Sequence, residues 1–282
     1  MSEANLDRHH LGQWVGKSES AKDTLHAAQA RLMQATLDQT PNLQTGAALP
    51  PLWHWAYFLT GLPMGALGRD GHAAKGEFLP PVPLPRRMWA GGRLTFHDAP
   101  KLGDTLTKTS TIKTVTVKEG RSGTLCFVTV EHVLTDQNDA PRVTEEQDLV
   151  FREDPAPDAP APKPTAPPEG SVASRTITPS TVQLFRYSAL TFNGHRIHYD
   201  RDYCRHVEGY PGIIVHGPLI ATLLAGFAQE QAGKALKAFN FRAVSPLFDT
   251  AAFAIHTDGQ GLVWAQTPEG NLAMKAEAVF ED

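Results

Sequence analysis

The densest group of chemically active side chains lies in the C-terminal third of the chain. Four of the twelve histidines fall between His195 and His216, and Asn193 stands five residues before His198. Histidine is the side chain best suited to proton transfer near neutral pH, and Gly194 allows the backbone between Asn193 and His198 to curl back. We therefore predict that Asn193 and His198 hold one water molecule between them.

A buried helix is predicted directly after His216, the last histidine of this group, and should position it. Gly217 is suited to the N-cap, Pro218 to the first helical position, and Gly233 to a stop. The run between them is apolar on nearly every side, which is typical of a helix surrounded by other elements. Strand-like runs follow at residues 238–243, 250–257, 262–267 and 271–280. The pattern predicts one buried helix wrapped by an antiparallel sheet.

The N-terminal half carries a related pattern. Residues 96–104 align at a constant offset with residues 241–249, and residues 148–154 resemble residues 277–282. Two matches in the same order indicate a duplication. Long strands are predicted at 108–118 and 123–135, a second buried helix at 52–59, and a solvated helix at 21–37.

A proline-rich stretch separates the two halves. Seven of the fourteen residues from 155 to 168 are proline, and such a stretch forms neither a helix interior nor a central strand. We predict an N-terminal domain at 1–153, a linker at 154–170 and a C-terminal domain at 171–282. The first domain has no counterpart of the 193–198 motif, so it is predicted to be a degenerate copy.

The segment from Arg186 to Asp200, with His-Gly at the start of the buried helix, resembles the (R)-specific enoyl-CoA hydratase motif of MaoC-like proteins. Together with residues 85–92, it is similar to a two-domain subgroup that includes itaconyl-CoA and mesaconyl-C4-CoA hydratases and type 2 3-hydroxyacyl-thioester dehydratases. The resemblance covers most of the chain after about residue 45. It implies an α+β double hot-dog, in which two antiparallel sheets each wrap a central helix and the site lies at their junction.

The resemblance also implies a reaction, the reversible hydration of a 2-enoyl thioester by a hydro-lyase. In the family an Asp and a His hold the water, and a backbone N–H at the start of the central helix stabilises the enolate. These positions are Asn193, His198 and Gly217, while His195 stands at the family's Asn. Asn193 is a departure, because an amide orients water by accepting a hydrogen bond but does not take its proton. We therefore assign the acid/base role to His198, the water to Asn193 and the oxyanion to the Gly217 N–H.

Arginines in and around the motif suggest a substrate class. Arg196 replaces a small or apolar residue of the family pattern, and Arg242 lies in the repeated stretch. Guanidinium groups bind carboxylates bidentately, so a dicarboxylic monothioester such as itaconyl- or mesaconyl-CoA is expected. Arg86 and Arg87 are candidates for the CoA phosphates. The predicted substrate-binding set is Arg86, Arg87, His195, Arg196, His216 and Arg242, with His216 capping the helix.

Composition excludes several classes of partner. With 26 Lys+Arg against 30 Asp+Glu, the chain has no basic excess for nucleic acid. The apolar runs at 52–67 and 213–227 are interrupted and shorter than the ~20 residues of a membrane span. Residues 1–12 lack a signal-peptide pattern, and Cys126 and Cys204 fit a reducing cytoplasm. We expect a cytoplasmic homodimer of double hot-dogs with an acyl-CoA substrate.

No cofactor is expected beyond the coenzyme A of the substrate. His195 and His198 have the spacing of a metal pair, but no third ligand is evident in the sequence, so no metal is predicted. Two alternatives stay open. A hot-dog thioesterase would need a carboxylate aimed at the thioester carbonyl, for which Asp200 and Asp202 are candidates. A non-catalytic acyl-thioester-binding protein would follow if the change to Asn193 had removed activity.

Overall fold

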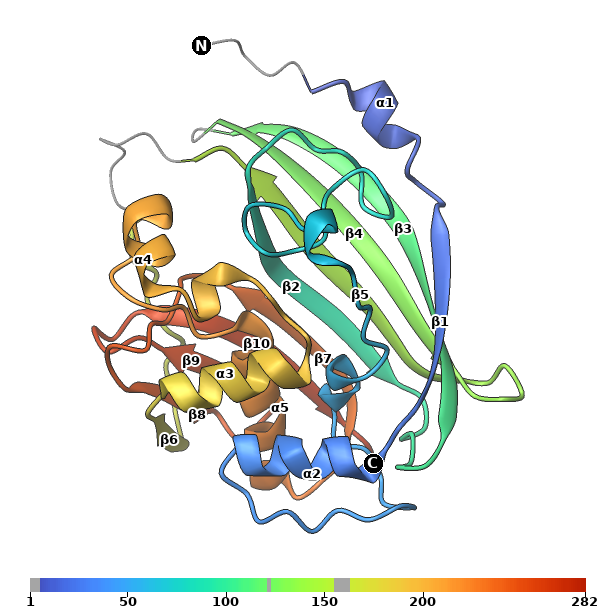
Figure 1. Ribbon diagram of the computed structural model, residues 1–282. Coiled ribbons are helices and arrows are strands. Elements are labelled where there is room, and N and C mark those ends of the chain that lie inside the picture. Colours follow the sequence, from blue (N-terminus) through green and yellow to red (C-terminus); the bar gives the residue numbers. More distant parts are fainter. Residues whose placement is uncertain (1–5, 121–122, 155–162) are drawn as a thin grey trace.

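One antiparallel sheet of ten strands forms the framework of the computed structural model, which describes residues 6–120, 123–154 and 163–282 (Figure 1). The strand order is β1-β3-β4-β5-β2-β7-β10-β9-β8-β6. The strands are β1 (Ser18–Thr24), β2 (Arg86–Phe96), β3 (Thr105–Gly120), β4 (Gly123–Thr135), β5 (Pro141–Arg152), β6 (Ala173–Ile177), β7 (Leu236–Ala243), β8 (Phe253–Thr257), β9 (Leu262–Gln266) and β10 (Leu272–Phe280).

The two halves of the sheet share one topology. Read outward from the centre, the order is β2-β5-β4-β3-β1 on one side and β7-β10-β9-β8-β6 on the other. The halves meet where β2 and β7 pair, with Gly91 opposite Arg242 and Thr95 opposite Ala238. This agrees with the duplication inferred from sequence, because the matched segments begin on β2 and β7 and end with β5 and β10.

The helical segments are mostly short. In the described residues the helical segments are α1 (Arg8–Gly12), α2 (Ala27–Thr36), α3 (Thr181–Leu190), α4 (Arg201–Tyr203), α5 (Gly217–Ala232), the 3-10 turns η1 (Trp53–Ala56), η2 (Met64–Ala66) and η3 (Arg196–His198), and the π turn η4 (Cys204–Glu208). None of them has the length and apolar character needed to cross a membrane.

The C-terminal half follows the prediction closely. Helix α5 packs against β7, β9 and β10, and half of its sixteen residues are buried, as its apolar surface requires. It ends at Gly233, whose φ of 63° is a left-handed C-cap conformation suited to glycine. Its N-cap is His216, so Gly217 is the first helical residue and not the cap. The four predicted strands are β7 to β10.

The buried helix predicted at 52–59 is wrong. Only the 3-10 turn η1 forms there, because prolines precede it and both Leu52 (φ 71°) and Phe58 (φ 57°) adopt left-handed conformations that end a helix. Trp53, Tyr57 and Phe58 are nevertheless buried, and Trp55 is partly buried. In the N-terminal half the concave face of the sheet is therefore crossed by the segment between α2 and β2, not by a long helix (Figure 1).

The solvated helix predicted at 21–37 is also partly wrong. Residues 18–24 form the edge strand β1, where Ser and Thr hydroxyls pair across to β3, as between Ser20 and Thr109 at 3.0 Å. Helix α2 begins only at Ala27 and buries Ala30 and Met33. The long strands at 108–118 and 123–135 are confirmed as β3 and β4. Residues 155–162 of the predicted linker lie outside the described residues.

We expect Gly91→Ala to destabilise the seam between the halves. A Cβ at Gly91 would lie 2.4 Å from the Phe241 carbonyl oxygen, a backbone atom held by the β2–β7 pairing. Overpacking of this kind costs about 1–3 kcal/mol, so the midpoint of urea unfolding should fall. The control is Gly226→Ala in α5, where a Cβ meets nothing within 4 Å and should stabilise by about 0.5–1 kcal/mol. An unchanged midpoint for Gly91→Ala would contradict the close approach.

Candidate active site

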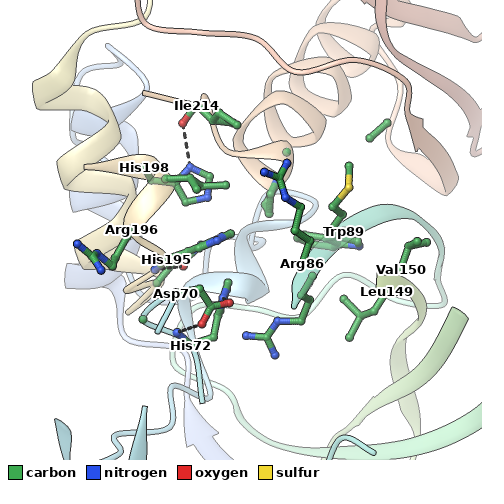
Figure 2. A pocket seen from close by; sticks show the side chains of 18 of the residues that line it. Asp70, His72, Arg86, Trp89, Leu149, Val150, His195, Arg196, His198 and Ile214 are labelled. Carbon is green, nitrogen blue, oxygen red and sulfur yellow. Dashed lines mark hydrogen bonds and ion pairs between the residues drawn. The ribbon is translucent and has the colours of Figure 1, made fainter. Parts of the chain in front are cut away.

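A cavity lies where the two halves meet, and both contribute residues to its wall (Figure 2). Figure 2 shows His198, His195, Asp70 and His72 along one side, and Arg86, Trp89, Leu149 and Val150 on the other. The first side combines the C-terminal motif with a turn at residues 68–72 of the N-terminal half. The second side belongs to β2 and β5. This position agrees with the site expected at the junction.

His198 has the geometry of a general base. Its ring is buried, and Nδ1–H donates to the Ile214 carbonyl oxygen at 2.8 Å, which leaves the lone pair on Nε2. Burial lowers the pKa of His198 to about 4, although the hydrogen bond to Ile214 opposes this. The imidazole is therefore neutral at pH 7, with a basic nitrogen in a residue that lines the cavity.

The His216 ring stacks on the His198 ring. The two rings stack with centroids 3.7 Å apart and an interplanar angle of 18°. A hydrogen bond of 2.8 Å joins His216 Nε2 to Ser188 Oγ on α3. Burial lowers the pKa of His216 well below its ordinary value, so the stacked rings are neutral and do not repel each other. His216 occupies the N-cap of α5 but makes no side-chain capping bond, so its contacts fit orientation of His198.

Gly217 presents its N–H at the start of α5. The residue lines the cavity, and a hypothetical Cβ there would meet nothing within 4 Å. In the described part of the chain no backbone or side-chain acceptor takes this N–H. The positive end of the helix adds to the attraction for a developing oxyanion. The arrangement therefore suits the oxyanion role predicted for Gly217.

Asn193 uses its side chain within the backbone turn. Its Oδ1 accepts a hydrogen bond from the His195 N–H at 3.0 Å, and its own N–H donates to the Ser188 carbonyl oxygen at 2.8 Å. The first of these bonds forms an Asx turn immediately before η3. The side-chain oxygen of Asn193 already accepts from the His195 N–H, and no observation shows it bound to water. The water-holding role of Asn193 therefore stays a prediction.

Three of the four predicted arginines are engaged elsewhere or point away. Arg196 donates to Asp200 at 2.7 and 3.1 Å and lies over the Tyr203 ring. Arg86 donates to Asp154 at 2.9 Å and to the Glu208 carbonyl oxygen at 2.9 Å. Arg242 is exposed on β7 and is not among the residues that line the cavity. None of these three presents a free guanidinium to a ligand in the cavity.

Arg87 is a predicted substrate-binding arginine that lines the cavity without a carboxylate partner among the described residues, and Arg152 is a second such arginine. Arg87 follows Arg86 on β2 and lines the cavity, and no carboxylate in the described residues lies within ion-pair distance of its guanidinium. Burial lowers its pKa, and the nearby negative charge of Asp70 only partly opposes this. A largely desolvated cation beside a cavity is well placed to bind an anionic group of a ligand.

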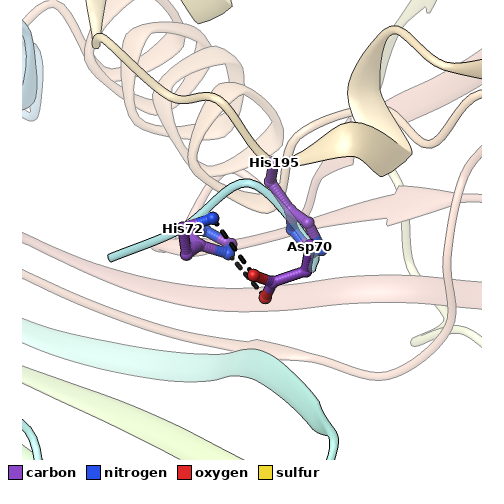
Figure 3. Close-up of side chains that lie close together, drawn as sticks. All are labelled: Asp70, His72 and His195. Atoms are coloured by element: carbon purple, nitrogen blue, oxygen red, sulfur yellow. Dashed lines mark hydrogen bonds and ion pairs between the residues drawn. The ribbon is translucent and has the colours of Figure 1, made fainter. Parts of the chain in front are cut away.

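Asp70 and His72 are site residues that the sequence analysis missed. Asp70 Oδ2 accepts from His72 Nδ1–H at 3.0 Å, and the His72 ring lies 4.2 Å from the His195 ring (Figure 3). Their sequence signal is slight, a Gly-Arg-Asp-Gly-His turn in a half without the motif. A carboxylate oxygen and two ring nitrogens from Asp70, His72 and His195 lie within 4.8 Å of one another. This cluster includes His195 but not His198, so it differs from the histidine pair considered from the sequence, and the absence of a metal stays a prediction.

Comparisons with known proteins identify the family of the chain. The sequence model of hydroxyacyl-thioester dehydratase type 2 matches residues 52–249. Mesaconyl-C(4)-CoA hydratase of Chloroflexus aurantiacus is 45% identical over 270 residues, which cover 93% of this chain and 95% of that protein.

Superposition on solved structures identifies the fold. A MaoC-like dehydratase from Phytophthora capsici superposes with a TM-score of 0.70 at 16% identity, covering 98% of this chain and 99% of that one. A Mycobacterium tuberculosis protein described as a double hot-dog superposes with a TM-score of 0.57 at 14% identity, covering 94% and 95%. The α+β double hot-dog fold is thus confirmed, and the chain belongs to the hydroxyacyl-thioester dehydratase type 2 family.

Proposed function

We propose that this protein is a hydro-lyase that adds water reversibly across the double bond of an enoyl-CoA whose acyl group carries a second carboxylate, with mesaconyl-C4-CoA as the first candidate. Family membership and the relative named for that reaction support the reaction class. The observation that carries the proposal is that neutral His198 and Gly217 line the same cavity, and that the described residues provide no partner for His198 Nε2 or for the Gly217 N–H.

The two groups divide the chemistry of hydration. As the water oxygen bonds to Cβ of the enoyl thioester, His198 Nε2 takes one of its protons. The electrons of the double bond move onto the thioester oxygen, where the Gly217 N–H donates to the developing charge. The enolate then takes a proton at Cα, which completes the addition. An oxyanion donor and a general base each contribute about 100-fold or more.

The second carboxylate is assigned to Arg87. Part of the cavity wall in the N-terminal half is polar and includes Lys108, His132, Glu145 and Gln147, which does not suit a long apolar acyl chain. Arg87 lines this wall and, like Lys108 and Arg152, has no carboxylate within ion-pair distance among the described residues. The second carboxylate of a short dicarboxylic acyl group would pair with the Arg87 guanidinium. The CoA phosphates are strongly hydrated, so we assign them to the solvent-exposed rim of the cavity.

The thioesterase alternative gains no support from its two candidate carboxylates. Asp200 pairs with Arg196 and accepts from the Tyr203 N–H at 2.9 Å, and Asp202 is exposed. Neither residue lines the cavity. Itaconyl-CoA is a second dicarboxylic substrate to test. The homodimer and the cytoplasmic location stay predictions from the sequence.

We expect the purified protein to hydrate mesaconyl-C4-CoA with a kcat/KM about 10- to 100-fold above that for crotonyl-CoA, which lacks the carboxylate, because a charge-assisted pair contributes about 1.5–3 kcal/mol. Loss of enoyl absorbance measures the reaction, and a thiol reagent in a parallel assay detects free CoA. Release of CoA without hydration would favour the thioesterase. Binding of the thioester without either change would favour the non-catalytic alternative.

A further inference from the structure

A histidine–carboxylate pair from the N-terminal half enters the active site. Within the turn at residues 68–72, Asp70 accepts two hydrogen bonds, from the His72 backbone N–H at 3.1 Å and from His72 Nδ1–H at 3.0 Å (Figure 3). The second bond fixes the tautomer of His72, so that Nε2 carries the lone pair. Burial lowers the pKa of His72 from its ordinary value, and the hydrogen bond to Asp70 opposes this by stabilising the protonated ring.

The turn is joined directly to the catalytic motif. The Arg196 N–H donates to the Asp70 carbonyl oxygen at 2.9 Å. Gly71, with φ of 87°, lies so close to Gly194 that a Cβ on Gly71 would be 2.1 Å from the Gly194 carbonyl oxygen. Two segments more than a hundred residues apart thus lie in direct backbone contact, and a side chain at residue 71 would prevent that approach.

Three imidazole rings follow one another along the cavity wall. The ring centroids of His72 and His195 are 4.2 Å apart, and those of His195 and His198 are 5.4 Å apart (Figure 2). His198 has no carboxylate partner within the described residues, whereas His72 has Asp70. The other charged or titratable groups that interact with His72 are Arg87, His195 and His198. The two ends of the row therefore differ in how well they hold a proton.

We propose that His72, oriented by Asp70, is the second acid/base group of the reaction and acts at Cα. The inference rests on the proposed hydration. In hydration, protonated His72 gives its Nε2 proton to the enolate at Cα while His198 takes a proton from water at Cβ. In dehydration, neutral His72 removes the Cα proton and His198 gives its proton to the departing hydroxide. The proton gained by one histidine returns to the other through solvent, so no net charge accumulates.

This assignment supplies the carboxylate that the motif lacks at Asn193. The side-chain oxygen of Asn193 already bonds to the His195 N–H, and an amide does not accept a proton in this pH range. The N-terminal half is then more than a wall of the acyl pocket. It contributes one of the two proton-transfer groups, and Asp70 is a positioning residue for His72.

The first test is hydration by His72→Gln and Asp70→Asn. Both variants should lower kcat about 10- to 1000-fold with little change in KM, since proton transfer and not binding is removed. Asp70→Asn keeps the shape but leaves one acceptor oxygen for two donors, so the tautomer of His72 is no longer fixed. The exposed histidine variant His97→Ala is the control. An unchanged kcat in both variants would overturn the inference and leave the proposed function intact.

The second test separates Cα chemistry from hydration. A saturated dicarboxylic CoA thioester without a β-hydroxyl is incubated in D2O, and exchange of its Cα proton is followed by mass spectrometry. Exchange should persist in His198→Ala and fall at least 10-fold in His72→Gln. Loss of exchange in His198→Ala alone would overturn the inference. If chelation abolishes hydration and added Zn²⁺ restores it, Asp70, His72 and His195 form a metal site and the acid/base role of His72 is wrong.

Discussion

His198→Ala is expected to lower kcat for thioester hydration about 100- to 10,000-fold, the range usual for loss of a general acid/base group. The physical reason is that Nδ1–H is held by the Ile214 carbonyl oxygen, so Nε2 is the one basic nitrogen that the ring offers. The measurement is steady-state decay of enoyl absorbance under saturating thioester. Because burial lowers the pKa of His198 to about 4, the neutral base persists through mildly acidic conditions. The contribution of this group to kcat/KM should fall only as the pH drops through about 4.

Two controls separate this chemical effect from an effect on folding. His198 is buried and stacked on His216, so His198→Gln, which is closer in volume, accompanies the alanine variant. Both variants should lose activity at temperatures where circular dichroism shows them folded. His97→Ala, in which an exposed ring bonded to Thr144 is removed, should retain full activity. If His198→Gln hydrates within threefold of the parent, the base lies elsewhere.

Arg87→Met should change substrate preference more than it changes catalysis. Methionine keeps an apolar stem of similar length but removes the guanidinium, so kcat/KM for mesaconyl-C4-CoA should fall about 10- to 100-fold, as expected for a charge-assisted hydrogen bond of about 1.5–3 kcal/mol. Crotonyl-CoA has no carboxylate for Arg87 to bind, so its kcat/KM should change less than threefold. Thermal unfolding of the free protein should be unchanged or shifted upward, because a desolvated cation is removed.

The matched control is Arg242→Met. Arg242 is exposed on β7 and does not line the cavity, so neither substrate should respond to its removal. Arg196→Met is an intermediate case, because its guanidinium pairs with Asp200 and its loss should affect both substrates alike. An equal loss for mesaconyl-C4-CoA and crotonyl-CoA in Arg87→Met would show that Arg87 binds the CoA portion that the two share.

Local physics explains which elements could be predicted from the sequence. Helix α5 is apolar on nearly all sides and ends at a glycine in the left-handed conformation. Strands β7 to β10 are short strand-like runs separated by turn residues. These patterns depend on residues close in the chain, so they are readable without a structure. The motif from Asn193 to His198 is equally local. The helix prediction at 52–59 was wrong because the apolar content of this segment resembles that of a buried helix. The prolines before it and the left-handed residues at its ends limit the segment to one turn.

The composition of the site was decided by the tertiary structure. The sequence predicted a double hot-dog with His198 in the motif and Gly217 at the start of a buried helix. It did not show that Asp70 and His72 reach the motif, or that, of the four predicted arginines, Arg87 is the one that lines the cavity without a carboxylate partner among the described residues. Arg69 and Arg196 are 127 residues apart yet share a hydrogen bond, because the β2–β7 seam brings the halves together and paired glycines let two loops touch. Such contacts have no periodicity along the chain, so only the folded molecule reveals them.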